Sequence, residues 1–224
     1  MKNNDLNVVI FSTEYIESSV IDLVNSISKE SKVIFVTTKE SLPPLYYNFI
    51  STNVVVEFVK ISRMRNPRCF FEIREVVRKI ISFNPDILHI QSNGHIWFFS
   101  ALDMLRNINV VNTIHDSRPH LGDKKSRGSY LLNKIGKLYT NRYITHTEHQ
   151  KILLTKLNNV HTEKIDVVPL AGHSIYSKID KTDYEEVLGS VLFFGRIWPY
   201  KGLDVLIKVE PLISAAVPNF KIVV

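Results

Sequence analysis

Short runs of β-branched and aliphatic residues alternate along the chain with segments in which apolar residues recur every three or four positions. Runs of the first kind are typical of buried strands, and segments of the second kind are typical of helices with one apolar face. The expected strands are residues 7–12, 32–37, 53–59, 86–90, 109–114, 142–145, 164–168, 190–195 and 220–224. Because helices separate the strands, the pattern predicts an α/β fold with a parallel sheet and helices on both of its faces.

The helices are expected where the apolar spacing is most regular. One spans about residues 20–27 behind a cap formed by Ser18 and Ser19, and another spans about residues 70–81. A third helix is expected from Thr147 to about residue 158. At its start, the Thr147 hydroxyl group and the Gln150 side chain are expected to form the two halves of a capping box.

The alternation stops at residues 169–189, which contain Pro169, Gly172 and Gly189 and few ordered apolar positions. We interpret this stretch as a linker between a first domain, residues 1–168, and the start of a second domain, residues 190–224. One strand-helix-strand unit of that size is smaller than a domain that holds its own core, so the second domain is expected to be incomplete.

The positive charge of the chain is concentrated in one segment. The 224 residues carry a formal net charge of +6 and are 45% hydrophobic, which excludes a disordered chain. Residues 116–142 contain seven Lys or Arg and two Asp, whereas the flanking regions are nearly balanced. This segment predicts a local anionic partner, and a solvated helix face is the alternative. Nucleic acid is not expected, because Tyr130 and Tyr139 are the only aromatic residues there.

The sequence argues against several other classes of protein. Cys69 is the single cysteine, so an internal disulfide and a four-cysteine zinc site are excluded. The first apolar run, residues 8–11, is too short for a signal peptide or a membrane span, and we expect a cytoplasmic protein. Glycine-rich nucleotide fingerprints and a His-Glu-x-x-His motif are absent, so no NAD, ATP or metal site is expected.

Two places in the chain carry candidate chemistry. His115 and Asp116 follow the expected strand 109–114, at the sheet edge where open α/β sheets bind ligands. We expect His115 to contact a sugar or a phosphate of a ligand, and a hydrogen bond to a neighbouring loop is the alternative. His89 alternates with buried positions and is expected to be a core histidine. Gly94 either admits a ligand to the backbone or is a turn glycine.

The second place is the connection between the strand at 190–195 and the following helix, expected at about residues 201–216. Arg196 and Lys201 lie five residues apart beside the expected start of this helix. Two cations and a helix N-terminus suit a diphosphate group, because all three contribute positive potential.

Four segments in this order resemble the group-one (family four) retaining glycosyltransferases. They are Asn84–His89, Thr113–Asp116, Lys164–Pro169 with Gly172, and Leu192–Arg196 followed by Tyr200–Ile207. The resemblance covers the whole chain, which corresponds to a complete N-terminal domain and the beginning of a C-terminal domain. It implies the GT-B architecture, in which two Rossmann-like domains bind the acceptor and the nucleotide-sugar.

The resemblance also implies roles for particular residues. His115 is expected to be catalytic and to lie near the transferred sugar, and Gly195, Arg196 and Lys201 are expected to hold the diphosphate of a UDP- or GDP-sugar without a metal. A saccharide or lipid-linked acceptor of cell-surface polysaccharide or glycolipid synthesis is expected on the first domain, at the inner membrane surface. The charge of residues 116–142, rather than the resemblance, assigns an acceptor or anion site to Asp116, Arg118, Lys124, Lys125 and Arg127.

Two departures from the family pattern limit these expectations. The glycine-rich loop that family members carry after the first strand is replaced by Ser12–Ser19. The family's pair of glutamates that contacts the donor would lie beyond residue 224, so this chain alone is expected to be inactive. The alternative function is a non-catalytic Rossmann-like module that binds an anionic membrane surface or a phosphorylated ligand.

Overall fold

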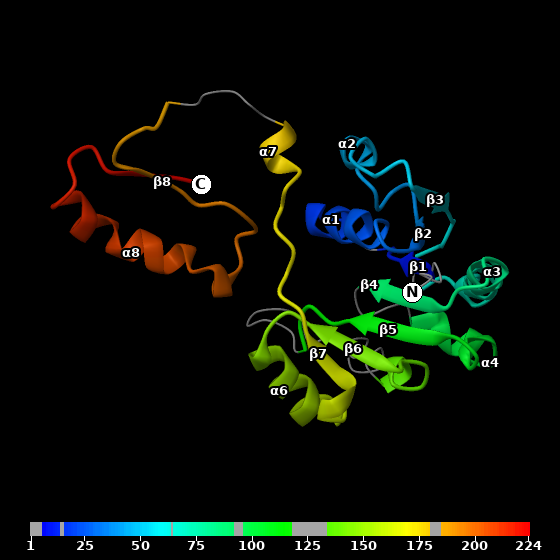
Figure 1. Ribbon diagram of the computed structural model, residues 1–224. Coiled ribbons are helices and arrows are strands. Elements are labelled where there is room, and N and C mark those ends of the chain that lie inside the picture. The colour runs from blue at the N-terminus through cyan, green and yellow to red at the C-terminus, as the bar shows by residue number, and fades with distance from the viewer. Residues whose placement is uncertain (1–5, 14–15, 64, 92–95, 118–133, 180–184) are drawn as a thin grey trace. The chain divides into compact units, whose positions relative to one another are not determined.

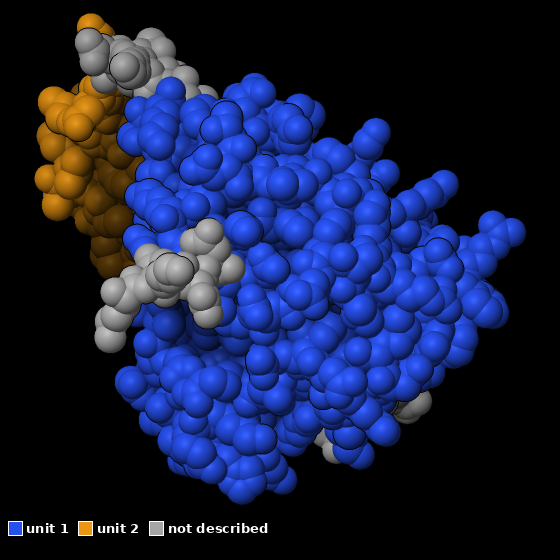
Figure 2. All heavy atoms as spheres, turned by 45° about the vertical axis from the view of Figure 1, so that its right-hand side comes forward, with its two compact units in different colours: residues 1–117, 126–180 blue, residues 118–125, 181–224 orange. Residues whose placement is uncertain are grey.

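The structure is a computed structural model that describes residues 6–13, 16–63, 65–91, 96–117, 134–179 and 185–224. The chain divides into two compact units, coloured separately in Figure 2: residues 1–117 with 126–180 form unit 1, and residues 118–125 with 181–224 form unit 2. The division after Asp180 falls inside the segment that the sequence analysis assigns to the linker. Five residues of interest lie outside the described residues: Gly94, Arg118, Lys124, Lys125 and Arg127.

Unit 1 is built on a seven-stranded parallel sheet (Figure 1). Its strands are β1 (Asn7–Phe11), β2 (Lys32–Thr37), β3 (Val54–Phe58), β4 (Ile87–Gln91), β5 (Asn109–Thr113), β6 (Arg142–Thr145) and β7 (Ile165–Val167). They lie in the order β3-β2-β1-β4-β5-β6-β7, and every neighbouring pair is parallel. Each observed strand is within one residue of its expected range, so the predicted parallel α/β sheet is confirmed.

Most of the helices described in unit 1 connect these strands, and the last one follows β7. They are α1 (Ser18–Ile27), α2 (Pro44–Tyr47), α3 (Cys69–Ser82), α4 (Leu102–Leu105), α6 (Glu148–Asn158) and α7 (Tyr176–Ile179), and short 3-10 turns span Ile96–Ala101 and Thr162–Lys164. α1 and α2 pack on one face of the sheet, and α3 and α4 pack on the other (Figure 1).

The alternation of side chains along β1 shows why both faces of the sheet are apolar. Val9 and Phe11 belong to the core under α3, whereas Val8 and Ile10 belong to the core under α1. Successive side chains of a strand point to opposite faces, so a strand covered by helices on both sides needs an unbroken apolar run. The Val-Val-Ile-Phe run of β1 meets that requirement.

The first expected helix cap is wrong. The N-cap of α1 is Glu17, and its side chain makes no capping hydrogen bond. Ser18 and Ser19 lie inside the first turn and are buried, and the Ser18 hydroxyl group is hydrogen-bonded to Nδ1 of His173. Ser18 is therefore hydrogen-bonded to a later segment of the chain, and neither serine is the N-cap of the helix.

One half of the expected capping box on α6 is present. The Thr147 hydroxyl group accepts a hydrogen bond of 3.2 Å from the backbone amide of Gln150. The Gln150 side chain does not return to the Thr147 amide, because its Oε1 accepts a hydrogen bond of 2.9 Å from the backbone of Ser117. The glutamine thus joins α6 to the segment that follows β5.

The basic segment is described only in part. Ile135 and Tyr139 are buried in the core of unit 1, whereas Leu138 is exposed.

The segment that follows β7 is attached to α1. The Asp22 carboxylate accepts hydrogen bonds of 2.9 Å from the Ser174 amide and 2.5 Å from the Ser174 hydroxyl group. Ile175 is buried in the core under α1. The first part of the stretch that the sequence analysis assigns to the linker is therefore packed on unit 1.

Unit 2 contains the strand-helix-strand arrangement that the sequence predicts. Strands β8 (Ser190–Leu192) and β9 (Lys221–Val223) are parallel, and the connection contains a 3-10 turn (Pro199–Lys201) and α8 (Leu203–Ser214). No described residue of unit 2 is buried, and large apolar side chains such as Leu192, Phe194 and Leu212 are exposed. Two strands and one helix are too few to enclose a core.

Candidate functional site

The strand order of unit 1 locates the place where a ligand is expected. From β1 the chain builds the sheet outward through β2 and β3, and it then returns to the other side of β1 to continue with β4 to β7. Open α/β sheets bind ligands at the carboxyl ends of the strands beside such a reversal. The candidate site should therefore lie near the ends of β1 and β4.

A pocket of about 200 Å³ lies at this edge, and we call it the histidine pocket. Its polar lining comes from the carboxyl ends of three neighbouring strands and from α1: Ser19, Ser26, His89, Gln91, Thr113, His115 and His146. Its apolar lining comes from α1, β6 and the segment after β7: Val20, Leu23, Ile144, Val168, Pro169, Leu170 and Ala171.

His115 lies in this pocket, two residues after the end of β5. Its ring is half-buried and faces the ring of His146, with 4.8 Å between the ring centroids. Burial lowers the pKa of His115, and the electrostatic effect of the neighbouring His146 lowers it further, while Glu17 and Asp116 act in the opposite direction. The net effect favours a neutral imidazole, which can accept a hydrogen bond or a proton from a ligand.

His89 forms part of the floor of the histidine pocket. Its Nε2 atom is 2.8 Å from the Thr113 hydroxyl group and 3.1 Å from the Gln91 side-chain amide. Because the side chain is buried, its pKa falls to about 4. The expectation of a hydrogen-bonded core histidine is confirmed, and the residue also lines the histidine pocket.

His146 was not among the residues singled out for chemistry, although a signal for it exists in the sequence. It follows β6 directly, as His115 follows β5 after Ile114, and the carboxyl ends of parallel neighbours meet at one edge. Two histidines after adjacent strands are therefore expected to be close.

Gly195, Arg196 and Lys201 lie in unit 2, between β8 and α8. Gly195 and Gly202 have positive φ angles of 125° and 74°, which favour glycine and let the connection turn on both sides of the two cations. Both cations are exposed, and neither forms an ion pair with a carboxylate of the described chain. Lys201 precedes the N-cap of α8, Gly202, which offers no capping side chain.

The backbone amides in the first turn of α8 have no side-chain cap, and Lys201 lies two residues before that turn. Asp204, the acidic residue of that turn, is 3.6 Å from Lys208 of the next turn. The predicted site residues are thus divided: His115 and Asp116 belong to unit 1, and Gly195, Arg196 and Lys201 belong to unit 2.

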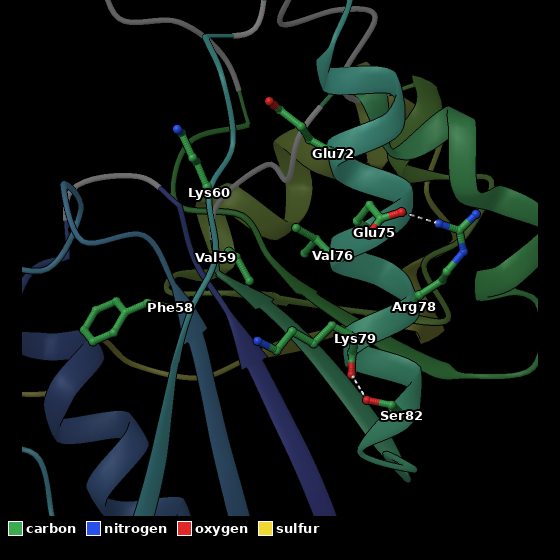
Figure 3. A pocket seen from close by; sticks show the side chains of 9 residues that line it. All are labelled: Phe58, Val59, Lys60, Glu72, Glu75, Val76, Arg78, Lys79 and Ser82. Carbon is green, nitrogen blue, oxygen red and sulfur yellow. Dashed lines mark hydrogen bonds and ion pairs between the residues drawn. The ribbon is translucent and has the colours of Figure 1, made fainter.

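A larger hollow of about 650 Å³ lies between the end of β3 and α3, but its chemistry is less promising (Figure 3). Arg78 forms an ion pair of 2.7 Å with Glu75, and Lys79 forms one of 2.5 Å with Glu57. These pairs neutralise two of the cations that line the hollow, and no residue assigned from the sequence lines it.

Metal-binding clusters and membrane-spanning helices are two further features considered for the described part of the chain. Within the described ranges, no three His, Cys, Asp or Glu side chains gather as a metal site would require. No helix in the same ranges has both the length and the apolar character needed to cross a membrane.

The sheet order and the pocket at its reversal define a Rossmann-like α/β protein. The chain belongs to Glycosyltransferase Family 4, whose family model matches residues 16–171. This match contains the whole lining of the histidine pocket. The resemblance stated from the sequence motifs is therefore confirmed at the level of the family.

Solved structures show the same fold at low sequence identity. Anabaena HepE in complex with UDP and glucose has a TM-score of 0.66 and 11% identity, over 97% of this chain and 60% of that chain. Sucrose-phosphate synthase from Thermosynechococcus elongatus has a TM-score of 0.64 and 14% identity, over 97% of this chain and 61% of that chain. UDP-N-acetylglucosamine 2-epimerase from Rickettsia bellii has a TM-score of 0.59 and 15% identity, over 98% of this chain and 61% of that chain.

The chain thus spans about three fifths of the length of these structures. No curated protein sequence matches it. The structural likeness confirms the Rossmann-like fold expected for the GT-B type, and it includes both glycosyltransferases and epimerases.

Proposed function

We propose that this chain is the acceptor-binding domain and the first donor-binding segment of a glycosyltransferase. The enzyme moves a sugar from a UDP- or GDP-sugar to a saccharide or lipid-linked acceptor, with retention at the anomeric carbon and without a metal. The observation that carries this proposal is the family match over residues 16–171, which includes His115 and the pocket around it.

The chemistry of glycosyl transfer assigns a role to the cations of unit 2. The bond from the anomeric carbon to the diphosphate oxygen breaks, and the leaving diphosphate gains negative charge as it does so. Arg196 and Lys201, together with the amides at the start of α8, stabilise that charge. Since the charge grows toward the transition state, these groups accelerate the reaction more than they tighten binding of the donor.

His115 acts on the sugar side of the same reaction. Its lowered pKa keeps the ring neutral near pH 7, so it can form a hydrogen bond with a hydroxyl group of the transferred sugar. A protonated ring would add a positive charge next to an anomeric carbon that itself becomes positive, which would oppose the reaction.

The acceptor side of the proposal uses the basic segment. Arg118, Lys124, Lys125 and Arg127, with Asp116, would hold a phosphorylated or lipid-linked acceptor and make peripheral contact with an anionic membrane surface in the cytoplasm. The excess of positive charge over residues 116–142 supports this assignment.

The test begins with a screen of UDP- and GDP-sugars for hydrolysis or transfer by the intact protein, followed by kinetics of Arg196→Ala and Lys201→Ala. We expect each variant to lower kcat by about a hundredfold or more, as loss of one contact to a developing anion does in other enzymes. Lys208→Ala is the matched control, because Lys208 is an exposed cation of α8 that is paired with Asp204, and it should leave kcat unchanged.

Unchanged kinetics in both variants would contradict the diphosphate assignment. Formation of an isomeric nucleotide-sugar, with no sugar transferred to water or to an acceptor, would contradict the glycosyltransferase itself and favour the epimerases that share the fold.

A further inference from the structure

A group of aromatic side chains is exposed where α3 begins. Phe71, in the first turn of α3, is 69% exposed, and Phe99, in the 3-10 turn that follows β4, is 42% exposed. Phe70 connects them, because its ring centroid lies 5.2 Å from that of Phe71 and 6.4 Å from that of Phe99. The ring of Trp97 packs beside Phe99, with 5.4 Å between the centroids. Aromatic side chains that are exposed as a group mark an interaction surface, whereas single exposed apolar residues are normal.

Hydrogen bonds and an ion pair hold the elements that carry these rings together. The Ser100 hydroxyl group donates a hydrogen bond of 3.1 Å to the carbonyl oxygen of Phe70. The Arg74 guanidinium donates to the carbonyl oxygen of Ser100 and forms an ion pair of 3.1 Å with the Asp103 carboxylate. These contacts join α3 to the 3-10 turn, so the spacing between the exposed rings of the two elements is fixed.

The segment that leads into α3 is strongly basic. Its exposed cations are Lys60, Arg63, Arg65 and Arg68, and none of them forms an ion pair with a carboxylate of the described residues. The Phe71 amide donates a hydrogen bond of 3.0 Å to the carbonyl oxygen of Arg68. Because residues three apart in a helical turn are neighbours, Arg68 and Phe71 lie on the same side of the helix start. Lys60 lies at the same end of α3 (Figure 3).

Glu72 does not cancel this charge. It is the only carboxylate of residues 60–74, it is half-buried, and Ser62 uses both of its oxygens. Its Oε2 accepts a hydrogen bond of 2.6 Å from the Ser62 amide, and its Oε1 accepts one of 2.7 Å from the Ser62 hydroxyl group. Glu72 therefore fastens the basic segment to α3, and the exposed side of that segment keeps an excess of positive charge.

An anionic lipid bilayer matches rings and cations in this combination. Aromatic rings are favoured at the depth of the lipid head groups, and each Lys or Arg beside an anionic membrane is attracted to it. Rings that project from a surface can enter the head-group layer without a recess of matching shape, whereas a protein partner has to supply one. We call the following residues the aromatic-basic surface: Lys60, Arg63, Arg65, Arg68, Phe71 and Phe99.

We propose that the aromatic-basic surface binds the head-group layer of an anionic lipid bilayer. Phe71 and Phe99 enter this layer, and the four cations contact lipid phosphates. The surface is separate from residues 118–127, to which the proposed function assigns membrane contact, and its binding requires no sugar transfer. Because α3 follows β3 and the 3-10 turn follows β4, it turns the carboxyl edge of the unit 1 sheet toward the bilayer.

The test measures co-sedimentation of the full chain with vesicles of equimolar phosphatidylglycerol and phosphatidylcholine, and with vesicles of phosphatidylcholine alone. Brominated acyl chains in the same vesicles quench a tryptophan only at short range. In a Trp198→Phe background they therefore report whether Trp97, the neighbour of Phe99, is close to lipid. We expect the chain to sediment with the anionic vesicles and Trp97 to be quenched by them, and we expect little of either with phosphatidylcholine alone.

Substitutions make the assignment specific to this surface. Phe71→Ala combined with Phe99→Ala should weaken binding to the anionic vesicles by roughly tenfold or more, because less apolar surface enters the lipid. Arg63→Ala and Arg68→Ala should each weaken it by about fivefold.

Leu6→Ala and Lys32→Ala are the matched controls. They replace an exposed apolar residue and an exposed cation at the opposite, amino edge of the sheet, where the Lys32 amide donates a hydrogen bond of 2.9 Å to the carbonyl oxygen of Leu6. Both controls should bind the vesicles as the unchanged protein does.

The proposal is overturned if anionic vesicles do not bind the chain, if they bind it without quenching Trp97, or if the variants of the aromatic-basic surface bind as tightly as the controls. It is also overturned if the chain dimerises without lipid and Phe71→Ala abolishes the dimer, since the surface is then an interface between two copies. A failure of the proposed function looks different. In that case anionic vesicles still bind the chain and quench Trp97, although no nucleotide-sugar is consumed.

Discussion

Protonation of His89 should make unit 1 sensitive to mild acid. The folded protein holds the pKa of this buried histidine at about 4, whereas an unfolded chain has the ordinary value of 6.5. As the pH falls below 6.5, His89 is protonated in the unfolded state but stays neutral in the folded state. The stability present at neutral pH is therefore lost progressively until about pH 4. For these two values the loss between pH 7 and pH 5 is about 2 kcal/mol. His115, whose pKa is also lowered, acts in the same direction.

The window from pH 7 to 5 isolates this effect from the carboxylates. Asp103, Asp166 and Glu72 also have lowered pKa values, but they gain protons in the unfolded state only near or below their ordinary values of 3.8 to 4.5. The perturbation that tests the idea is therefore His89→Gln, which keeps a polar side chain beside Thr113 but removes the titration.

Urea unfolding at several pH values measures the loss. Trp97 packs against the core of unit 1, so its fluorescence in a Trp198→Phe background reports on this unit alone. Between pH 7 and 5 the free energy of unfolding decreases in both proteins. We expect the decrease to be about 2 kcal/mol smaller in His89→Gln than in the parent. His161→Gln, at an exposed histidine, should behave as the parent does. Equal pH dependence in the parent and in His89→Gln would refute the reasoning.

Two further predictions concern α6 and the basic segment. Thr147→Ala removes the side chain that caps α6 and should lower the free energy of unfolding by about 1 kcal/mol, measured by urea unfolding, whereas Thr162→Ala, at a turn without a side-chain cap, should change it little. Charge reversal at Lys124, Lys125 and Arg127 should weaken sedimentation with anionic liposomes or raise KM for a phosphorylated acceptor; if neither changes, the anionic partner assigned to this segment is wrong.

The order of strands and helices could be predicted because the physics of a doubly covered sheet is local. Each strand of the centre must be apolar on both faces, so Val8 to Phe11 stands out as an unbroken run. The amphipathic period of α3 follows equally from the fact that one of its faces is buried, as Ile73, Val77 and Ile80 show. The position of His115 at the carboxyl edge follows from the strand that precedes it.

Details that depend on distant segments could not be predicted in this way. Ser18 does not cap α1, because His173, 155 residues later, supplies the partner of its hydroxyl group. Gln150 does not close its capping box, because Ser117 competes for its side chain. In both cases a polar side chain with a local partner in the sequence finds a different partner in the folded chain.

The proposed function gives the histidine pocket of unit 1 and the cations of unit 2 different roles. The described lining of the pocket offers neutral hydrogen-bonding groups and apolar walls, so it can select a sugar but gives no charge to a phosphate. Arg196 and Lys201, by contrast, are exposed cations in the connection that leads to an uncapped helix start, so they can meet a phosphate but distinguish one sugar from another poorly. Under the proposed function, changes at Arg196 or Lys201 should therefore lower turnover with every sugar that is accepted.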